Sequence, residues 1–279
     1  MLHHTVPYPL GVSLHTVDPE QRIETIASLA GSPVKSVEIW EPAFSKDAGF
    51  IEEARRAFAA AGVAPRSVHA AFGAPLDISF PDPDIRAAGL TAIGVALDLA
   101  ASLGAQMVIV HPSSEPIEPD DRALRMELSK RSLETIAGLA RDAGCRIAIE
   151  LLPRSCLGHS ADELLELLGD IDPARAGVCL DVNHLMDRYA ELPAVVHRLG
   201  SRLITLHCSD YDGVDEKHWP PLRGVIDWPA FVAALREVGY TGPLHYEAGL
   251  DGQTPAEKLA FLSQNYAELV KTSMEGRLR

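Results

Sequence analysis

Short runs of aliphatic residues recur along the whole chain and give the first structural signal in the sequence. Each run is too short for a helix and lacks polar alternation, which is typical of a strand buried on both faces of a parallel sheet. The runs cover Leu10–Leu14, Ser36–Trp40, Arg66–Ala70, Met107–His111, Arg146–Leu151, Gly177–Val182, Leu203–His207 and Leu244–Ala248. The segments between them are long enough to hold a crossover helix each time.

Helix boundaries are predicted within these intervening segments. Asp18-Pro19 and Asp82-Pro83 have the sequence of an N-cap followed by proline in the first turn. Residues 160–163 and 254–257 have the sequence of capping boxes. Helix exits are predicted at glycines, which tolerate a left-handed backbone: Gly31, Gly62, Gly104, Gly144 and Gly239.

The alternation of strand and helix signals predicts the fold class. Eight such units in about 250 residues indicate a single closed (β/α)8 TIM barrel, with residues 1–279 as one domain. A doubly wound open sheet is the alternative, but its glycine-rich turn after the first strand is absent from residues 14–18. No linker rich in serine and glycine marks a domain boundary.

Composition narrows the class of protein and its expected location. The chain has 25 Lys and Arg against 39 Asp and Glu, a net charge of −14, which argues against a non-specific polyanion partner. Its four cysteines form no Cys-x-x-Cys pair, which indicates reduced thiols in a cytoplasmic protein. We expect no signal peptide at residues 1–4, and no membrane span in the polar-interrupted segment 90–110.

Ionisable side chains gather at the carboxyl ends of the last six predicted strands. Each of these ends carries a carboxylate or an imidazole: His69, His111, Glu150, Asp181, His207 and Glu247. In a TIM barrel these ends meet at one mouth, where catalytic residues lie. A single such residue is more often structural, but burying several ionisable groups together is costly unless a cation or a pattern of protons compensates, and a divalent metal ion is the simplest compensation.

Four of these residues are expected to hold a divalent metal ion. Glu150, Asp181, His207 and Glu247 come from adjacent strands and can converge on one point. Three carboxylates and one imidazole suit Mn²⁺, Mg²⁺ or Co²⁺, and the imidazole also admits Zn²⁺.

Among the other strand-end residues, Glu38 is interpreted as structural, and His245 as a buried histidine one layer deeper. Three aromatic residues are candidates for the pocket wall: Trp40, Phe72 and Trp219.

These segments together resemble the xylose isomerase-like TIM barrel superfamily, which groups sugar isomerases and epimerases, inosose dehydratase and endonuclease IV. The resemblance covers nearly the whole chain and rests on the order and spacing of seven segments: His69-Ala70, His111-Pro112, Glu150-Leu151, Asp181-Val182-Asn183-His184, His207-Cys208-Ser209-Asp210, Gly224-Val225-Ile226-Asp227-Trp228 and Tyr246-Glu247. The ketose 3-epimerase branch has metal ligands that match Glu150, Asp181, His207 and Glu247. Its acid–base pair matches the two glutamates, Glu150 and Glu247.

The resemblance also implies residues that bind substrate or a second metal ion. His184 matches a histidine that contacts substrate, and His218 lies in the loop that supplies a further polar residue. The whole set comprises His69, His111, His184, His218 and Arg223. Residues 221–224 read Pro-Leu-Arg-Gly where the family often has Pro-Gly-x-Gly, so the loop that borders the substrate differs from its relatives.

The expected function is that of a divalent-metal-dependent isomerase or epimerase. Its substrate would be a small sugar, sugar phosphate or polyol, with glutamate-mediated proton transfer through a metal-stabilised enediolate. Isomerisation, epimerisation and inosose-type dehydration all remain open. The relatives imply a homodimer or homotetramer, and neither nucleic acid nor membrane is an expected partner.

An endonuclease IV-like zinc phosphodiesterase acting on damaged DNA is the alternative function. Its wider ligand pattern also matches the histidines above, but its Asp-x-His pair is missing, because Asp215 and His218 are separated by one extra residue. The mouth loops also offer few cations to a DNA backbone: Arg154, Lys217 and Arg223. A sugar-sensing barrel without turnover is a third possibility, and the glutamate pair argues against it.

Overall fold

The computed structural model describes residues 8–275, so His3 and His4 lie outside the described residues. Its strands are β1 (Leu10–Ser13), β2 (Val34–Trp40), β3 (Ala64–His69), β4 (Met107–Val110), β5 (Arg146–Glu150), β6 (Ala176–Asp181), β7 (Leu203–His207) and β8 (Leu244–Tyr246). All are parallel and pair in the order β7-β6-β5-β4-β3-β2-β1-β8. Just after β7, Cys208 pairs with Tyr246 of β8, which brings the two edges of the sheet together. The predicted TIM barrel is confirmed.

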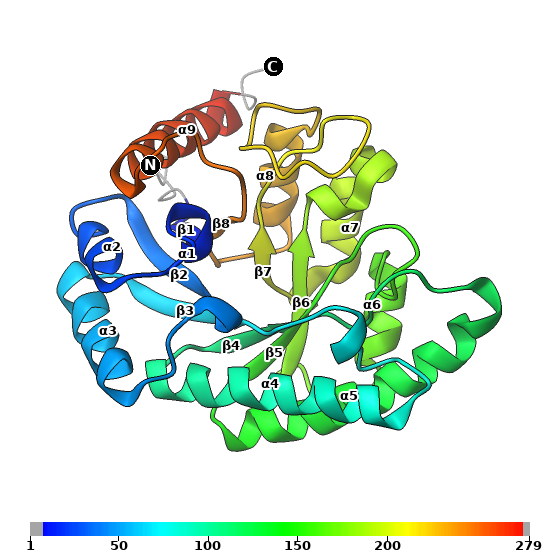
Figure 1. Ribbon diagram of the computed structural model, residues 1–279. Helices are drawn as coiled ribbons and strands as arrows, with labels where there is room; N and C mark the ends of the chain where they lie inside the picture. The colour runs from blue at the N-terminus through cyan, green and yellow to red at the C-terminus, as the bar shows by residue number, and fades with distance from the viewer. Residues whose placement is uncertain (1–7, 276–279) are drawn as a thin grey trace.

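Helices surround this ring of strands (Figure 1). The α-helices are α1 (Leu14–Val17), α2 (Ile23–Ser28), α3 (Ala48–Ala61), α4 (Pro83–Leu103), α5 (Arg122–Asp142), α6 (Ala161–Leu168), α7 (Leu192–Leu199), α8 (Trp228–Glu237) and α9 (Pro255–Glu275). Short 3₁₀ helices lie in the loops: η1 (Glu41–Ala43), η2 (Ala74–Leu76), η3 (Pro119–Asp121), η4 (Asn183–Glu191) and η5 (Gly200–Arg202).

Burial on both faces explains why the strands read as continuous apolar runs. In β4, Val108 and Val110 join the large core between sheet and helices. Met107 and Ile109 join a smaller cluster with residues of β5, β6 and β7, which alternation places inside the barrel. Most predicted strands extend one or two residues beyond the observed carboxyl end, because the chain there no longer pairs with the neighbouring strands. β8, for example, ends at Tyr246, so Glu247 lies just beyond it.

The predicted helix caps are confirmed in part. Asp82 accepts the amide of Asp84, and Thr254 and Glu257 exchange the reciprocal bonds of a capping box. Ser160 accepts the amide of Glu163 as predicted. The five predicted exit glycines all have positive φ. The prediction of a helix start at Asp18 is wrong.

Asp18 instead follows α1, and α2 begins only at Ile23. Its buried carboxylate accepts the Thr25 hydroxyl at 2.6 Å and Arg22 Nε at 2.9 Å, so it anchors the turn between the two helices. The acidic residue before proline therefore has a tertiary role that the local pattern did not reveal.

Helix α4 is long and apolar enough to cross a membrane by length and composition alone. In the structure it is an outer helix of the barrel that packs against β3 and β4. Its residues Ile93, Ala96 and Leu97 are buried there. Packing on the sheet therefore accounts for its apolar composition.

Candidate active site

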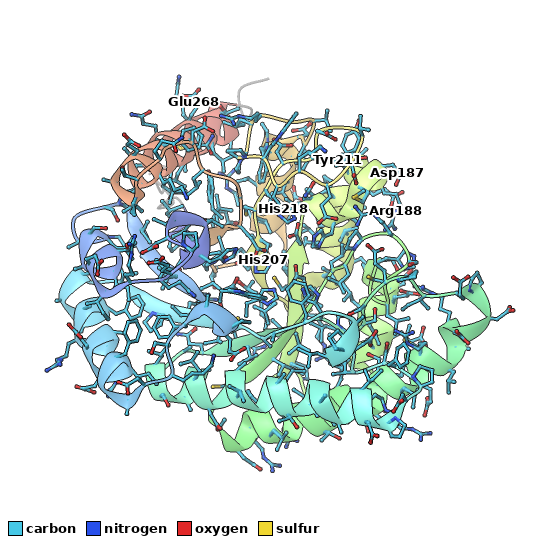
Figure 2. All side chains as sticks on the ribbon, in the orientation of Figure 1. Asp187, Arg188, His207, Tyr211, His218 and Glu268 are labelled. Atoms are coloured by element: carbon cyan, nitrogen blue, oxygen red, sulfur yellow. The ribbon has the colours of Figure 1, made fainter. Side chains whose placement is uncertain are left out.

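A cavity of about 710 Å³ lies at the carboxyl ends of the strands. Of the predicted site residues, six line it: His69, His111, Glu150, His184, His218 and Glu247. Asp181 and His207 are wholly buried and lie against these residues. Figure 2 shows His207 inside the ring of helices and His218 beside it on the loop after β7, whereas Glu268 lies on the outer helix α9.

The four residues predicted to hold a metal ion converge on one point. Each of Glu150, Asp181, His207 and Glu247 offers one ligand atom, and these atoms all lie within 4.8 Å of one another. Nδ1 of His207 is 2.7 Å from Glu247 Oε2, 3.2 Å from Glu150 Oε1 and 3.9 Å from Asp181 Oδ2. Sheet register produces this arrangement, because Asp181 and His207 are direct partners across β6 and β7.

Asp181 provides an independent sign that a cation belongs at this point. Its Oδ1 accepts the amide of Asn183 at 2.8 Å, but its Oδ2 is buried and has no hydrogen-bond partner. Burial raises the pKa of the Asp181 carboxyl. Leaving a buried carboxylate oxygen without a partner is unfavourable, and a divalent cation would supply the missing interaction. The donor set therefore fits a divalent metal ion.

Two histidines hold the second oxygen of Glu150. Nε2 of His69 and Nε2 of His111 each lie 3.1 Å from Glu150 Oε2. Burial lowers the pKa of His69, but the bond to Glu150 outweighs it and raises this pKa to about 9. Burial keeps the pKa of His111 below its ordinary value. His69 is therefore protonated near neutral pH and can donate to Glu150. Phe72 stacks on His111 with ring centroids 3.9 Å apart, and so helps to fix this wall of the cavity.

The structure changes the interpretation of Glu38, which the sequence places outside the site. This carboxylate of β2 is 1% exposed and lies 3.2 Å from Nε2 of His207. It also accepts the hydroxyls of Ser13 at 2.9 Å and Ser67 at 2.8 Å. A carboxylate on the far nitrogen of a ligating histidine fixes the ring and its tautomer. Glu38 thus orients Nδ1 of His207 toward the three other ligands.

His184 and His218 meet at a carboxylate that the sequence analysis missed. Oε1 of Glu216 lies 3.2 Å from His218 Nε2 and 3.5 Å from His184 Nε2. Burial lowers the pKa of both histidines, but neighbouring carboxylates outweigh burial. The pKa of His184 rises to about 10, chiefly because of Asp181. The pKa of His218 rises to about 9, chiefly because of Glu216. The sequence signal for this carboxylate is the spacing Glu216-x-His218. It was missed because the expected pair is Asp-x-His. Asp215 instead pairs with Arg154 at 2.9 Å.

Some expected site residues do not reach the cavity. The guanidinium of Arg223 pairs with Asp251 at 2.6 Å on the surface, and Arg223 is absent from the described cavity lining. Trp219 is also absent from that lining, while Trp40 and Phe72 belong to it. Conversely, His15 lines the cavity although the sequence analysis gave it no role. It lies in α1, directly after β1.

The comparison with protein families decides the identity of this barrel. Residues 26–265 match the family described as xylose isomerase-like TIM barrel, which is most of the chain. The chain belongs to the xylose isomerase-like TIM barrel family.

Two curated relatives and a solved structure are similar to this chain. A ketose 3-epimerase of Arthrobacter globiformis is 26% identical over 204 residues, 71% of this chain and 68% of that protein. An uncharacterised protein of Methanocaldococcus jannaschii is 28% identical over 185 residues, and the match spans 64% of this chain and 63% of that protein. A crystal structure described as a D-tagatose 3-epimerase-like protein superposes with a TM-score of 0.81 at 24% identity, covering 96% of this chain and 99% of that one.

Proposed function

We propose that this chain is a divalent-metal-dependent sugar epimerase or isomerase. The observation that carries the proposal is the convergence of Glu150, Asp181, His207 and Glu247, two of them glutamates that line the cavity. The names of its relatives, ketose 3-epimerase and inosose isomerase, support sugar chemistry of this type. A cytoplasmic location and a homodimeric or homotetrameric state remain predictions.

Glu150, Asp181, His207 and Glu247 would hold the metal ion. When bound, such an ion polarises the carbonyl of a sugar and so acidifies the neighbouring carbon. Mn²⁺, Mg²⁺ or Co²⁺ suits the three carboxylates, and Zn²⁺ is compatible with the imidazole. The chain's own contribution is to orient the ligands, chiefly through Glu38 at His207 and the two histidines at Glu150.

The two glutamates would move the proton. Glu150 lies on β5 and Glu247 follows β8, so the carboxylates reach the cavity from strands that β6 and β7 separate. Burial raises the pKa of Glu247, but His207 outweighs it and lowers this pKa to about 2. Glu247 is therefore ionised and can accept a proton at its carboxylate oxygen. Burial raises the pKa of Glu150, but the neighbouring histidines outweigh burial and hold this pKa well below its ordinary value, so protonated His69, 3.1 Å from Glu150 Oε2, would be the store of the proton that returns on the other face. Removal on one face and return on the other gives epimerisation.

His184 and His218 would bind the substrate's hydroxyl groups. Both line the cavity, and both are held by Glu216, which Arg154 holds in turn at 3.0 Å. Both Nε2 atoms face Glu216, and both Nδ1 atoms have main-chain acceptors, so a substrate hydroxyl would bind by displacing Glu216 from an Nε2 atom. Dehydration of an inosose uses the same base and differs only in the loss of a hydroxyl, so it belongs to the same proposal.

A centre with more than one metal ion is the second candidate, favoured by two further ligand groups. His69, His111 and Glu150 bring ligand atoms within 4.8 Å of one another, as do Asp181, His184 and His218. Several ions would favour the phosphodiesterase alternative. Counting the ions per chain, with a cleavage assay on abasic DNA, distinguishes the two candidates.

The proposal is tested by proton exchange. Metal-loaded protein is incubated in D₂O with a panel of ketoses and inososes, and deuterium next to the carbonyl is measured by NMR. We expect incorporation that a chelator abolishes and that Glu150→Gln and Glu247→Gln each reduce at least about 100-fold. Glu127→Gln, an exposed residue of α5, is the matched control. Absence of exchange with every sugar of the panel would contradict the proposal.

A further inference from the structure

Among the described residues, two basic side chains line the cavity, Arg154 and Lys258. Arg154 is neutralised, because its guanidinium lies within 3.1 Å of the carboxylates of Glu115, Asp215 and Glu216. Lys258 has no ion-pair partner in the described part of the chain. Its Nζ donates one hydrogen bond, at 3.0 Å, to the main-chain oxygen of Thr16. An ammonium has three N–H donors, so two remain beside the cavity.

Lys258 lies in the first turn of α9, where a positive charge is locally unfavourable. The first turn of a helix carries a partial positive charge and favours anions over cations. The nearby amides are already used, because those of Gln253 and Thr254 donate to Glu257, and that of Glu257 donates to Thr254. A lysine that departs from the local preference at a cavity wall indicates a functional role.

The group of expected metal ligands is itself negative. A divalent ion held by the carboxylates of Glu150, Asp181 and Glu247 retains a net charge of 2 − 3 = −1. Glu38 adds a further buried carboxylate beside His207. The ligand group therefore offers no net positive charge to an anionic group on a substrate, and the protonated His184 and His218 are already paired with Glu216, whereas Lys258 offers an unpaired ammonium.

We propose that Lys258 binds an anionic group, a phosphate or a carboxylate, of a substrate held in the cavity. This inference rests on the proposed function and narrows its substrate class to acidic sugars. The cavity, at about 710 Å³, is in the size range of small-molecule sites and has room for such a group. The position also agrees with the general tendency of TIM barrels to bind phosphate after the last two strands, since α9 follows β8.

The test uses three ketoses that differ only at C6: D-fructose, D-fructose 6-phosphate and D-fructuronate. Binding to the metal-loaded protein is measured by calorimetry, and deuterium exchange is measured in parallel. We expect the wild-type chain to bind one or both anionic compounds at least about 10-fold more tightly than D-fructose, since a charge-assisted bond is among the stronger polar contacts. Phosphate and carboxylate as sources of the charge are told apart by which compound binds.

Variants separate recognition from structure. Lys258→Gln is expected to weaken binding of the preferred anionic compound about 10- to 100-fold and to change D-fructose less than about threefold. Lys258→Arg should restore the preference for the anion. Lys271→Gln, which removes the same charge from an exposed position of α9, is the matched control.

Two results would overturn the inference. One is binding of the anionic compounds no tighter than that of D-fructose, and the other is an equal loss for all three in Lys258→Gln, which indicates that the lysine only anchors Thr16. Either result leaves the proposed function intact if neutral sugars exchange their proton. Absence of exchange with all sugars, together with Lys258-dependent binding of the anion, would instead contradict the proposed function alone.

Discussion

Replacement of Glu38 by glutamine tests how the site orients its one imidazole ligand. The carboxylate accepts three hydrogen bonds, from Ser13, Ser67 and His207, and is 1% exposed. Glutamine keeps the size but has one carbonyl oxygen, and its amide group presents donors where the carboxylate presents an acceptor. Either His207 Nε2 or a serine hydroxyl must then change its partner, and the negative charge that favours the Nδ1 ligand is lost.

The expected effect has two measurable parts. Loss of a carboxylate behind a ligating histidine weakens metal binding by roughly 10- to 100-fold. Disturbance of one buried hydrogen bond lowers the free energy of unfolding by about 1–3 kcal/mol. Calorimetric titration with Mn²⁺ measures the first, and urea unfolding in EDTA measures the second without the metal.

The matched control is Glu41→Gln, because this residue is 5% exposed, lies three positions further along the chain and pairs with Lys46. We expect its Mn²⁺ affinity to equal that of the wild-type chain. A Glu38→Gln variant that binds Mn²⁺ as tightly as the wild type would refute the positioning role of Glu38.

Further predictions concern stability. Burial raises the pKa of Glu163, but bonds from His159 and Arg122 outweigh it and lower this pKa to about 2, below the ordinary 4.5. The ionised Glu163 carboxylate therefore stabilises the fold fully above about pH 4.5, and this contribution is lost as the pH falls towards 2. In urea titrations, the difference in free energy of unfolding between the wild type and Glu163→Gln should shrink over that range. A difference that stays constant with pH would contradict this prediction. The buried guanidinium of Arg125 lies 2.5 Å from Asp77, and Asp77→Asn leaves it without its counter-charge. This variant should lower the free energy of unfolding by about 3–5 kcal/mol. Asp98→Asn, at an exposed position, is the control and should leave the free energy of unfolding unchanged.

The fold and the ligand group could be predicted because both follow from local patterns. Buried parallel strands read as apolar runs, and the ends of such strands meet at one mouth, so Glu150, Asp181 and His207 could be placed from their strands alone. The predicted strand Leu244–Ala248 runs two residues past the end of β8, but Glu247 still reaches the group from just beyond it.

The supporting residues could not be predicted in the same way. Glu38 lies on β2, which β1 and β8 separate from β7, and its contact with His207 depends on how side chains fill the interior, which no local pattern encodes. Arg223 has the charge expected of a substrate-binding residue, but the loop directs it to Asp251. Lys258 is one of three lysines in the described α-helices, with Lys130 and Lys271, and only the tertiary structure shows that its Nζ contacts Thr16 and borders the cavity.

The central claim is that four side chains bind one divalent ion at this mouth, and Asp181 tests it most directly. Equilibrium dialysis against Mn²⁺, with metal quantified by mass spectrometry, compares the wild-type chain with Asp181→Ala. We expect at least one tightly bound ion per wild-type chain and a loss of about 100-fold or more in affinity for the variant, because the variant lacks the unpartnered Oδ2 that would contact the ion. A wild-type chain that binds no ion, or a variant that binds it equally well, would contradict the account.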